Sequence, residues 1–317
     1  ARPVVLAAIV DAGLSVNDVS EVIVANSLAG GGNPARVVGL AAGLPLRVAG
    51  LTIDRQCAGG LDAIILGDAL IRSGQCEVAL VGGVESYSRR PLRFQTFADG
   101  SEPLAYDQAK FTPWTDRDPD MAEAADMLAA RLEIGRKAQD AWAIESHAKA
   151  IVDKEDRAIV TIAGVGKDKF TRKLTARLCA RAKVVAGDIT SANMAVAADA
   201  AAFVVMVSAE FARVRGLTGL QVLAGTTLGG DPEMPGLAPV AAINAVMEKT
   251  HVSVADLAAA EIMEAFAVQA IACQEATGIP VERVNVRGGA LARGHPIGAS
   301  GAILAVNLFH QLRCPDD

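Results

Sequence analysis

Blocks of apolar residues alternate along the chain with amphipathic stretches, and this pattern predicts alternating strands and helices. Strands are expected where about four to eight residues run without a polar break, and helices where apolar residues recur every three or four positions. The predicted strands are residues 21–27, 48–54, 78–84, 201–208 and 220–228. The predicted helices are residues 4–14, 35–44, 60–74, 239–249 and 303–312. Continuous apolar strands between helices are typical of layered α/β proteins.

The middle of the chain has a different character. Residues 91–120 hold much of the aromatic and proline content and are expected to be irregular. Residues 120–151 follow two amphipathic helical patterns with a break near Ile134 and Gly135. We therefore expect an inserted domain between two halves. The predicted units are residues 1–88 with 198–217 as the first half, 89–197 as the insertion and 218–317 as the second half.

One short segment occurs twice. Residues 13–29 align with residues 251–267, and both contain Ser-Val-x-Asp before a predicted strand, 238 positions apart. In the second copy, residues 260–267 are expected to run from a strand into a helix. The same shift of 238 positions takes Cys57 to His295. We infer a duplicated α/β unit whose halves are related by a pseudo-two-fold axis, each half giving one loop to a shared site.

Cys57 stands between a predicted strand and a predicted helix, two positions before Gly59 and Gly60. The thiolate is the reactive form of cysteine, and its pKa falls at a helix N-terminus or beside a histidine. We therefore expect the helix start to favour a Cys57 thiolate, with the glycines leaving room for a substrate. The alternative is a buried and unreactive cysteine, which is a commoner fate for this residue type.

His295 lies in residues 284–307, which read as a strand, a glycine-rich loop and a helix. Pro296 would set the start of that helix. Histidine is seldom used for packing in a glycine-rich loop, so we interpret His295 as a candidate catalytic base. The alternative is an ordinary histidine in a surface loop.

The composition narrows the classes of function. The net charge of −6 argues against a nucleic-acid partner, and no apolar run approaches the roughly 20 residues of a membrane span. Five cysteines without a CxxC pair favour free thiols and a cytoplasmic protein, and four histidines show no metal-ligand spacing. No G-x-G-x-x-G motif follows the first predicted strand, which argues against a dinucleotide-binding dehydrogenase.

Five segments together resemble the thiolase family. They are DRQCAGGLDAI, VGGVESYS, DMAEAADMLA, EIMEAFAVQA and NVRGGALARGHPIGASGA, in the family's order. The setting of Cys57 is most similar to degradative 3-ketoacyl-CoA thiolases, which are acetyl-CoA C-acyltransferases. The resemblance implies a five-layered αβαβα fold and an inserted loop domain that binds coenzyme A. It also implies a homodimer or homotetramer without a tightly bound cofactor, acting on acyl-CoA and coenzyme A in fatty-acid β-oxidation.

The resemblance implies a role for individual residues. Cys57 would be the nucleophile that becomes acylated, and His295 would activate it. Glu264 would support the site from the EIMEAFA segment. The backbone N–H groups of Gly298 or Ala299 would help to stabilise the oxygen of the thioester.

The resemblance also places four residues along a coenzyme A tunnel. They are Met121, Ser191, Asn193 and Ala195; the alternative for Met121, Ser191 and Asn193 is that they are simply packed. Two departures from the family pattern fall near this tunnel and the nucleophile. A serine and a glycine of the family are Ala195 and Val196 here, and an asparagine or histidine is Met263. Because a thioether cannot donate a hydrogen bond, loss of that donor could cost about 2.7–4 kcal/mol of transition-state stabilisation.

Two further departures concern the nucleophile and the end of the chain. Asp54 replaces an asparagine of the family, and its charge is expected to raise the pKa of Cys57. The family's second cysteine, in a C-x-G-G-G turn, has no match up to residue 317; Cys314 lacks the glycines, and we expect the second half to be incomplete. The main alternative is therefore a diverged thiolase-like protein that binds acyl-CoA or a partner with little or no turnover. A condensing enzyme loaded from a carrier protein fits the residues 294–302 less well.

Overall fold

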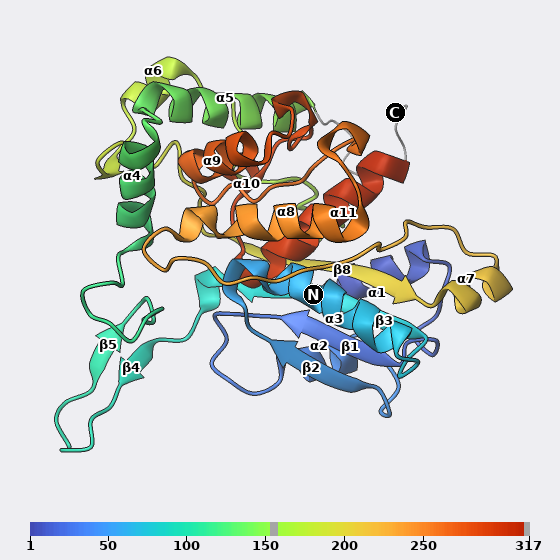
Figure 1. Ribbon diagram of the computed structural model, residues 1–317. Coiled ribbons are helices and arrows are strands. Elements are labelled where there is room, and N and C mark those ends of the chain that lie inside the picture. The colour runs from blue at the N-terminus through green and yellow to red at the C-terminus, as the bar shows by residue number, and fades with distance from the viewer. Residues whose placement is uncertain (153–157, 314–317) are drawn as a thin grey trace.

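The computed structural model describes residues 1–152 and 158–313. Its main sheet has four strands in the order β2-β1-β3-β8 (Figure 1). Strand β1 (Glu21–Ala25) pairs in parallel with β2 (Ala49–Ile53) and with β3 (Val78–Ser86). Strand β8 (Asp199–Val207) follows the insertion in the chain and pairs antiparallel with β3. The four strands predicted from the apolar runs of the first half are thus confirmed.

Helices cover both faces of this sheet. Helices α1 (Arg2–Asp11) and α2 (Pro34–Ala41) pack on one face, and α3 (Gly59–Arg72) packs on the other. Helix α11 (Ile297–Arg313), from the end of the chain, packs against α3, β3 and β8. The last helix of the described chain therefore lies beside α3, the helix between β2 and β3.

The alternation of side chains along β1 explains why it is covered on both sides. Val22 and Val24 belong to the apolar cluster formed with α1 and α2, whereas Ile23 belongs to the cluster formed with α3. Successive side chains of a strand point to opposite faces, so a strand between two helical layers must be apolar throughout.

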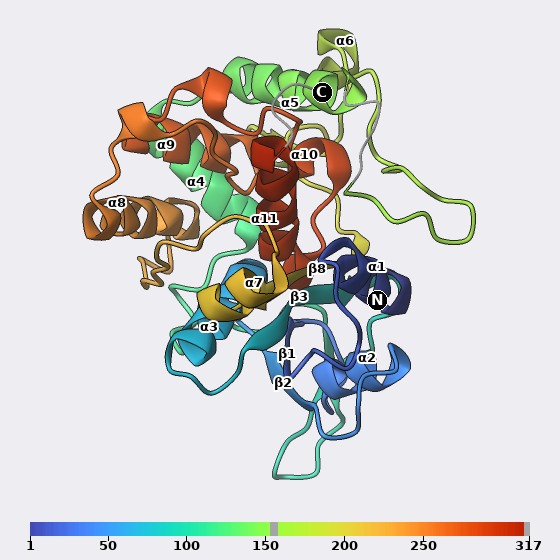
Figure 2. The ribbon, with the colours of Figure 1, turned by 90° about the vertical axis from the view of Figure 1, so that its right-hand side faces the viewer.

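The second half adds more helices beyond α11. Helices α8 (Ala238–Thr250) and α9 (Ala267–Thr277) pack together, and Figure 2 shows α11 standing between them and α1. The segment 260–266 runs between these layers: Ile262 packs among side chains of α8 and α9, while Glu261 has Asn307 of α11 as a neighbour. The layers are therefore helix, sheet, helix, extended chain and helix.

The prediction of a strand at residues 220–228 is wrong. This segment lies over α3 and makes no strand ladder within the described part of the chain. Two of its carbonyl groups bind side chains instead: Val222 accepts from Arg72 (2.7 Å) and Gly225 accepts from Lys249 (3.4 Å). Apolar composition alone therefore does not make this segment part of a sheet.

The strands predicted at the start of residues 260–267 and of residues 284–307 are also wrong. Both segments make only isolated bridges, of which one joins Ala260 to Val284. Two backbone bonds make this bridge, and beyond it the backbone N–H of Ile262 donates to the side chain of Asn285 (2.8 Å) instead of to a neighbouring strand. The helical part of the prediction is confirmed by α9.

The insertion contains the two predicted helices and one unexpected hairpin. Helix α4 (Met121–Leu132) ends at Glu133 in the left-handed conformation (φ 55°), and α5 (Arg136–Val152) follows, which confirms the predicted break. Strands β4 (Arg93–Gln95) and β5 (Leu104–Tyr106) form a hairpin that projects from the molecule (Figure 1), in a segment expected to be irregular. The shorter elements are α6 (Ala176–Ala180), β6 (Val184–Ala186), β7 (Ile189–Thr190), α7 (Ala209–Arg215), α10 (Ala290–Arg293), η1 (Gln56–Ala58), η2 (Tyr87–Arg89), η3 (Pro235–Leu237), η4 (Val254–Asp256) and η5 (Val281–Arg283).

The sequence repeat has a structural counterpart. Asp18 accepts hydrogen bonds from the backbone N–H (2.8 Å) and the hydroxyl (2.7 Å) of Ser15. Asp256 accepts the same pair from Ser253, at 2.9 and 2.5 Å. The Ser-Val-x-Asp turn therefore folds in the same way in both halves.

The two halves meet where glycines allow backbones to touch. A Cβ added to Gly60 of α3 would overlap the backbone nitrogen of Ala302 in α11, and one added to Gly301 would lie 2.5 Å from the nitrogen of Leu61. Gly83 of β3 faces Gly298 in the same close manner. No larger residue fits at these positions unless α3, β3 and α11 move apart.

This contact gives a test of the packing. Gly60→Ala should lower the free energy of unfolding by about 1–3 kcal/mol, because the added methyl group meets backbone atoms that cannot rotate away. Denaturant unfolding followed by circular dichroism measures the loss. Gly39→Ala, in helix α2, is the matched control: its Cβ would lie 3.4 Å from the flexible side chain of Leu44, and alanine favours a helix. Equal stability of the two variants would show that α3 and α11 are not in close contact.

Candidate functional site

Cys57 and His295 lie together at the contact between the halves. The Cys57 Sγ and the His295 Nε2 are 3.0 Å apart, although 238 positions separate the two residues in the chain. Cys57 lies in the short helix η1 that leads into α3, and His295 lies between α10 and α11. The structure thus brings together the two residues that the sequence repeat relates, each on a loop before one of the two packed helices.

The chain makes a sharp turn just before Cys57. Gln56 is in the left-handed conformation (φ 48°), which is unfavourable for a residue with a side chain. The Asp54 carboxylate holds this turn by accepting from the Gln56 N–H (2.8 Å) and from the Ser27 hydroxyl (2.7 Å). Asp54 therefore joins the turn to the loop after β1. This contact fixes the direction of the chain between the end of β2 and Cys57.

His295 is held through its backbone and through its ring. Its N–H donates to the carbonyl of Val196 (2.7 Å), and a parallel bridge joins it to Ala197. The Nδ1 atom lies 2.7 Å from the hydroxyl oxygen of Ser300, in the first turns of α11. Ser300 is a site residue that the sequence analysis did not single out; a serine five positions after the histidine of a Gly-His-Pro segment was the available signal.

The surroundings favour an uncharged thiol and an uncharged imidazole. Many protein atoms surround the Cys57 sulfur although the residue remains open to solvent, and this desolvation raises its pKa above the ordinary value. The Asp54 and Glu85 carboxylates raise it further, while the N–H of Cys57 itself opposes the shift. Burial lowers the pKa of His295 to about 4. The expectation that the helix start favours a thiolate is therefore wrong, because loss of hydration and two carboxylates outweigh the helix start.

Glu85 is a second site residue that the sequence analysis missed. Its carboxylate is buried at the end of β3 and accepts from the backbone N–H of Gly298 in α11 (3.0 Å). It also accepts from the side-chain amide of Asn26 (3.0 Å) and from the N–H groups of Ser27 and Leu28 (both 3.2 Å). A charged residue ending an otherwise apolar buried strand was the signal. Glu85 thereby joins the loop after β1 to the helix that follows His295.

The backbone groups predicted to stabilise a thioester oxygen are already occupied. The N–H of Gly298 donates to Glu85, and the N–H of Ala299 donates to the carbonyl of Pro296 (2.8 Å). Neither group can donate to a substrate in this arrangement, so that prediction is corrected. The residues instead start helix α11 and anchor it to β3.

Glu264 supports the site without contacting His295. Its buried carboxylate accepts from the indole N–H of Trp142 (3.0 Å) and the hydroxyl of Ser146 (2.7 Å), both on α5. It also accepts from the side chain of Asn285 (2.9 Å) and the N–H of Leu291 (3.2 Å), on either side of the glycine-rich turn. Glu264 therefore holds the segment that leads to His295 against the insertion.

The predicted coenzyme A tunnel residues and Met263 differ from one another in their exposure to solvent. Asn193 is fully buried, and its side chain accepts from the N–H of Thr190 (2.7 Å) and donates to the carbonyl of Asp188 (3.0 Å). It is closed off from solvent, so the prediction that it lines a coenzyme A tunnel is corrected to a structural role. Met121, Ala195 and Met263 are half-buried, and Ser191 is exposed.

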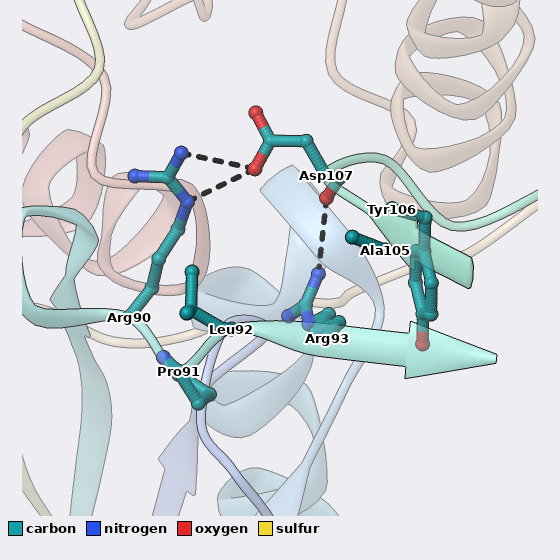
Figure 3. A pocket seen from close by; sticks show the side chains of 7 residues that line it. All are labelled: Arg90, Pro91, Leu92, Arg93, Ala105, Tyr106 and Asp107. Carbon is teal, nitrogen blue, oxygen red and sulfur yellow. Dashed lines mark hydrogen bonds and ion pairs between the residues drawn. The ribbon is translucent and has the colours of Figure 1, made fainter. Parts of the chain in front are cut away.

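A small cavity lies at the base of the β4–β5 hairpin, next to the loop after β1. It measures about 380 Å³ and is lined by residues 90–93 and 105–107. Figure 3 shows the Arg90 guanidinium directed at Asp107, with the two hydrogen bonds at 2.9 and 3.1 Å. Arg93 donates to the carbonyl of Ser27 (3.1 Å), the residue whose hydroxyl binds Asp54. The hairpin base is therefore connected through Ser27 to the turn that precedes Cys57.

The described residues hold neither a metal site nor a membrane-spanning helix. No group of three or more His, Cys, Asp or Glu within residues 1–152 and 158–313 is placed to hold a metal ion. In the same part of the chain, every helix is too short or too polar to cross a membrane. Cys314 lies outside the described residues.

Two family models match the chain. The model of the thiolase N-terminal domain matches residues 1–210, and the model of the thiolase C-terminal domain matches residues 219–317. "Putative acetyl-CoA C-acetyltransferase YhfS" of Bacillus subtilis is 38% identical over 95% of this chain and 82% of its own length. "Putative acetyl-CoA C-acetyltransferase VraB" of Staphylococcus epidermidis is 34% identical over 92% of this chain and 81% of its own length.

Solved structures show the same likeness. The acetyl-CoA acetyltransferase of Bacillus anthracis has a TM-score of 0.89 at 32% identity, covering 99% of this chain and 86% of that one. Human mitochondrial 3-ketoacyl-CoA thiolase has a TM-score of 0.89 at 29% identity, with the same coverage. The predicted thiolase-like α/β fold is thereby confirmed.

The charge state of the pair at Cys57 can be tested by its reactivity. Because the pKa of the thiol is raised, alkylation of Cys57 by iodoacetamide should keep accelerating as the pH rises past the ordinary cysteine value of about 8.5. Peptide mass spectrometry would follow Cys57 separately from the other cysteines, with Cys57→Ser as the blank. A rate that is already constant near pH 7 would reveal a thiolate–imidazolium pair and contradict the neutral pair.

Glu264→Gln tests the anchoring of the glycine-rich turn. The amide would turn an NH₂ group toward two of the four donors, so we expect the free energy of unfolding to fall by about 2 kcal/mol. Glu145→Gln, on the exposed face of the same helix as Trp142, is the control and should change it little. If the two variants unfold at the same denaturant concentration, Glu264 does not hold the turn.

Proposed function

This chain belongs to the thiolase family, and from that premise we propose that it is an acyltransferase acting on 3-ketoacyl-CoA through a covalent intermediate on Cys57. The observation that carries the proposal is the 3.0 Å contact between the Cys57 sulfur and the His295 Nε2, at a thiol open to solvent. A nucleophile within hydrogen-bond reach of a base that is itself held by a third group is the arrangement used in covalent catalysis.

The proposed reaction begins with transfer of the thiol proton from Cys57 to the Nε2 of His295. The sulfur bonds to the 3-keto carbon of the substrate, the bond between carbons 2 and 3 breaks, and carbon 2 takes up the proton that His295 accepted and leaves as acetyl-CoA. A second coenzyme A thiol then attacks the acyl-enzyme, returns the shortened acyl group to solution as acyl-CoA and restores the Cys57 thiol. The low pKa of His295 keeps it in the neutral form that accepts a proton.

The relatives and the site both support the proposed substrate class. Two of the similar proteins carry the name acetyl-CoA C-acetyltransferase and one solved structure is a 3-ketoacyl-CoA thiolase. We therefore place the activity in fatty-acid β-oxidation or related chain breakdown, with coenzyme A as substrate and product. Because Met263 offers no hydrogen-bond donor and Ala195 no hydroxyl, we expect slow turnover.

We also propose that the chain forms a homodimer or homotetramer in the cytoplasm. Strand β2 is at the end of the sheet and pairs only with β1 in the described residues, and Leu51 on it is 42% exposed. An open strand edge of this kind is a ready site for pairing with a second copy. The four cysteines described in the structure are all free thiols, which suits a reducing compartment.

A second candidate is an acyl-CoA-binding protein that completes only part of the reaction. The Met263 and Ala195 side chains favour it, because neither supplies the polar group that the family pattern has at its position. In that case an acyl group would be transferred to Cys57 and remain there.

Intact-protein mass spectrometry separates these functions. After incubation with acetoacetyl-CoA or a longer 3-ketoacyl-CoA, the wild type should gain one acyl group that disappears when coenzyme A is added. Cys57→Ala should gain none, and His295→Ala should gain it at least about 100-fold more slowly, since the base is lost. A persistent adduct would support the partial reaction. Absence of any adduct in the wild type would contradict the proposed acyltransferase.

A further inference from the structure

Ser300 makes a contact with His295 that the proposed reaction leaves unexplained. It lies in α11, five positions after the histidine, and is 3% exposed. Its hydroxyl oxygen is 2.7 Å from the Nδ1 of His295 and 3.1 Å from the carbonyl oxygen of Pro296. No carboxylate bonds to Nδ1 within the described residues, so the hydroxyl takes the place that an aspartate has in a Ser-His-Asp triad.

Counting hydrogens indicates which ring nitrogen carries the proton. A serine hydroxyl has one hydrogen to donate. If it donates to the Pro296 carbonyl, its oxygen can only accept from Nδ1, which must then carry the ring proton. The Nε2 atom is left with a lone pair, facing the Cys57 sulfur at 3.0 Å. A protonated thiol requires an acceptor at that place, so both contacts of His295 are satisfied by the same tautomer.

We propose that Ser300 is a positioning residue that keeps the ring proton of His295 on Nδ1 and thereby keeps Nε2 available as the proton acceptor for Cys57. Without the hydroxyl, the His295 ring can rotate and carry its proton on Nε2. An Nε2 atom that already carries a proton cannot accept the thiol proton of Cys57. The proposal rests on the Cys57–His295 pair of the proposed function, but it does not depend on which thioester is the substrate.

The first test is the tautomer of His295 in the wild type. Nitrogen-15 NMR of uniformly labelled histidine at neutral pH distinguishes a protonated from an unprotonated ring nitrogen, and the chain has only four histidines. The signals of His295 are assigned as those missing from His295→Gln. We expect Nδ1 to be protonated and Nε2 to be unprotonated. A proton on Nε2 would overturn the proposal, whatever the variants show.

The second test measures the effect of removing the hydroxyl. In Ser300→Ala we expect Nε2-protonated His295 to appear in the NMR spectrum, and alkylation of Cys57 by iodoacetamide at pH 8 to slow by up to about tenfold, the effect of one hydrogen bond. Neither readout needs an acyl-CoA, so a failed acylation assay with normal results here would reject the proposed function and leave this proposal standing.

The matched control is Thr277→Val. The Thr277 hydroxyl is also largely buried in a helix and also bonds to the carbonyl four residues earlier, that of Cys273 (2.7 Å), but it contacts no histidine in the described structure. It should leave the His295 signals and the alkylation rate unchanged. If Ser300→Ala is folded and behaves like this control in both readouts, Ser300 only packs the helix and the proposal is wrong.

Discussion

The site depends on the direct contact of two backbones. Helices α3 and α11 approach so closely at Gly60 and Gly301 that no side chain separates them, and this distance determines how near Cys57 comes to His295. Each reactive residue lies just before one of these helices, so the helices act as two rigid supports with a common contact point. Glu85 strengthens the arrangement by binding the start of α11 to the end of β3. The reactive pair is thus a product of packing between the halves and belongs to neither of them alone.

The electrostatic character of the pair follows from the same packing. Bringing the loops together removes water from the thiol and the imidazole, and the carboxylates that fix the loops, Asp54 and Glu85, lie close to the sulfur. Both effects disfavour a resting ion pair, so in the proposed reaction Cys57 loses its proton during acyl transfer instead of before it. In that reaction the carboxylates that build the site also make Cys57 dependent on His295 as its base.

Much of the fold and part of the candidate site could be predicted from the sequence, for reasons that differ between the two halves. Uninterrupted apolar runs identify the four strands of the first half because their neighbours in the sheet bury both faces. The same signal fails at residues 220–228, where Arg72 and Lys249 take the carbonyl groups, and periodicity cannot reveal which partner a carbonyl finds. Cys57 and His295 stood out by residue type and spacing. Glu85 and Ser300 did not, because their importance lies in contacts with backbone and ring atoms that only folding brings together. The prediction for Gly298 and Ala299 failed for the same reason, since folding gives their N–H groups to the Glu85 carboxylate and the Pro296 carbonyl.

The segment before Cys57 and the segment before His295 are held by different numbers of backbone hydrogen bonds. Cys57 follows a strand whose amides are bonded in a cooperative sheet, whereas the segment before His295 is held by isolated bridges and the side chains of Glu264 and Asn285. Local opening requires less free energy where fewer backbone bonds break together. Thermal or chemical stress will therefore release the base before it releases the nucleophile. In a partly opened molecule His295 no longer lies beside Cys57, so the proton transfer proposed for this pair needs the complete fold. Under the proposed function, acyl transfer is therefore lost while most of the protein is still folded.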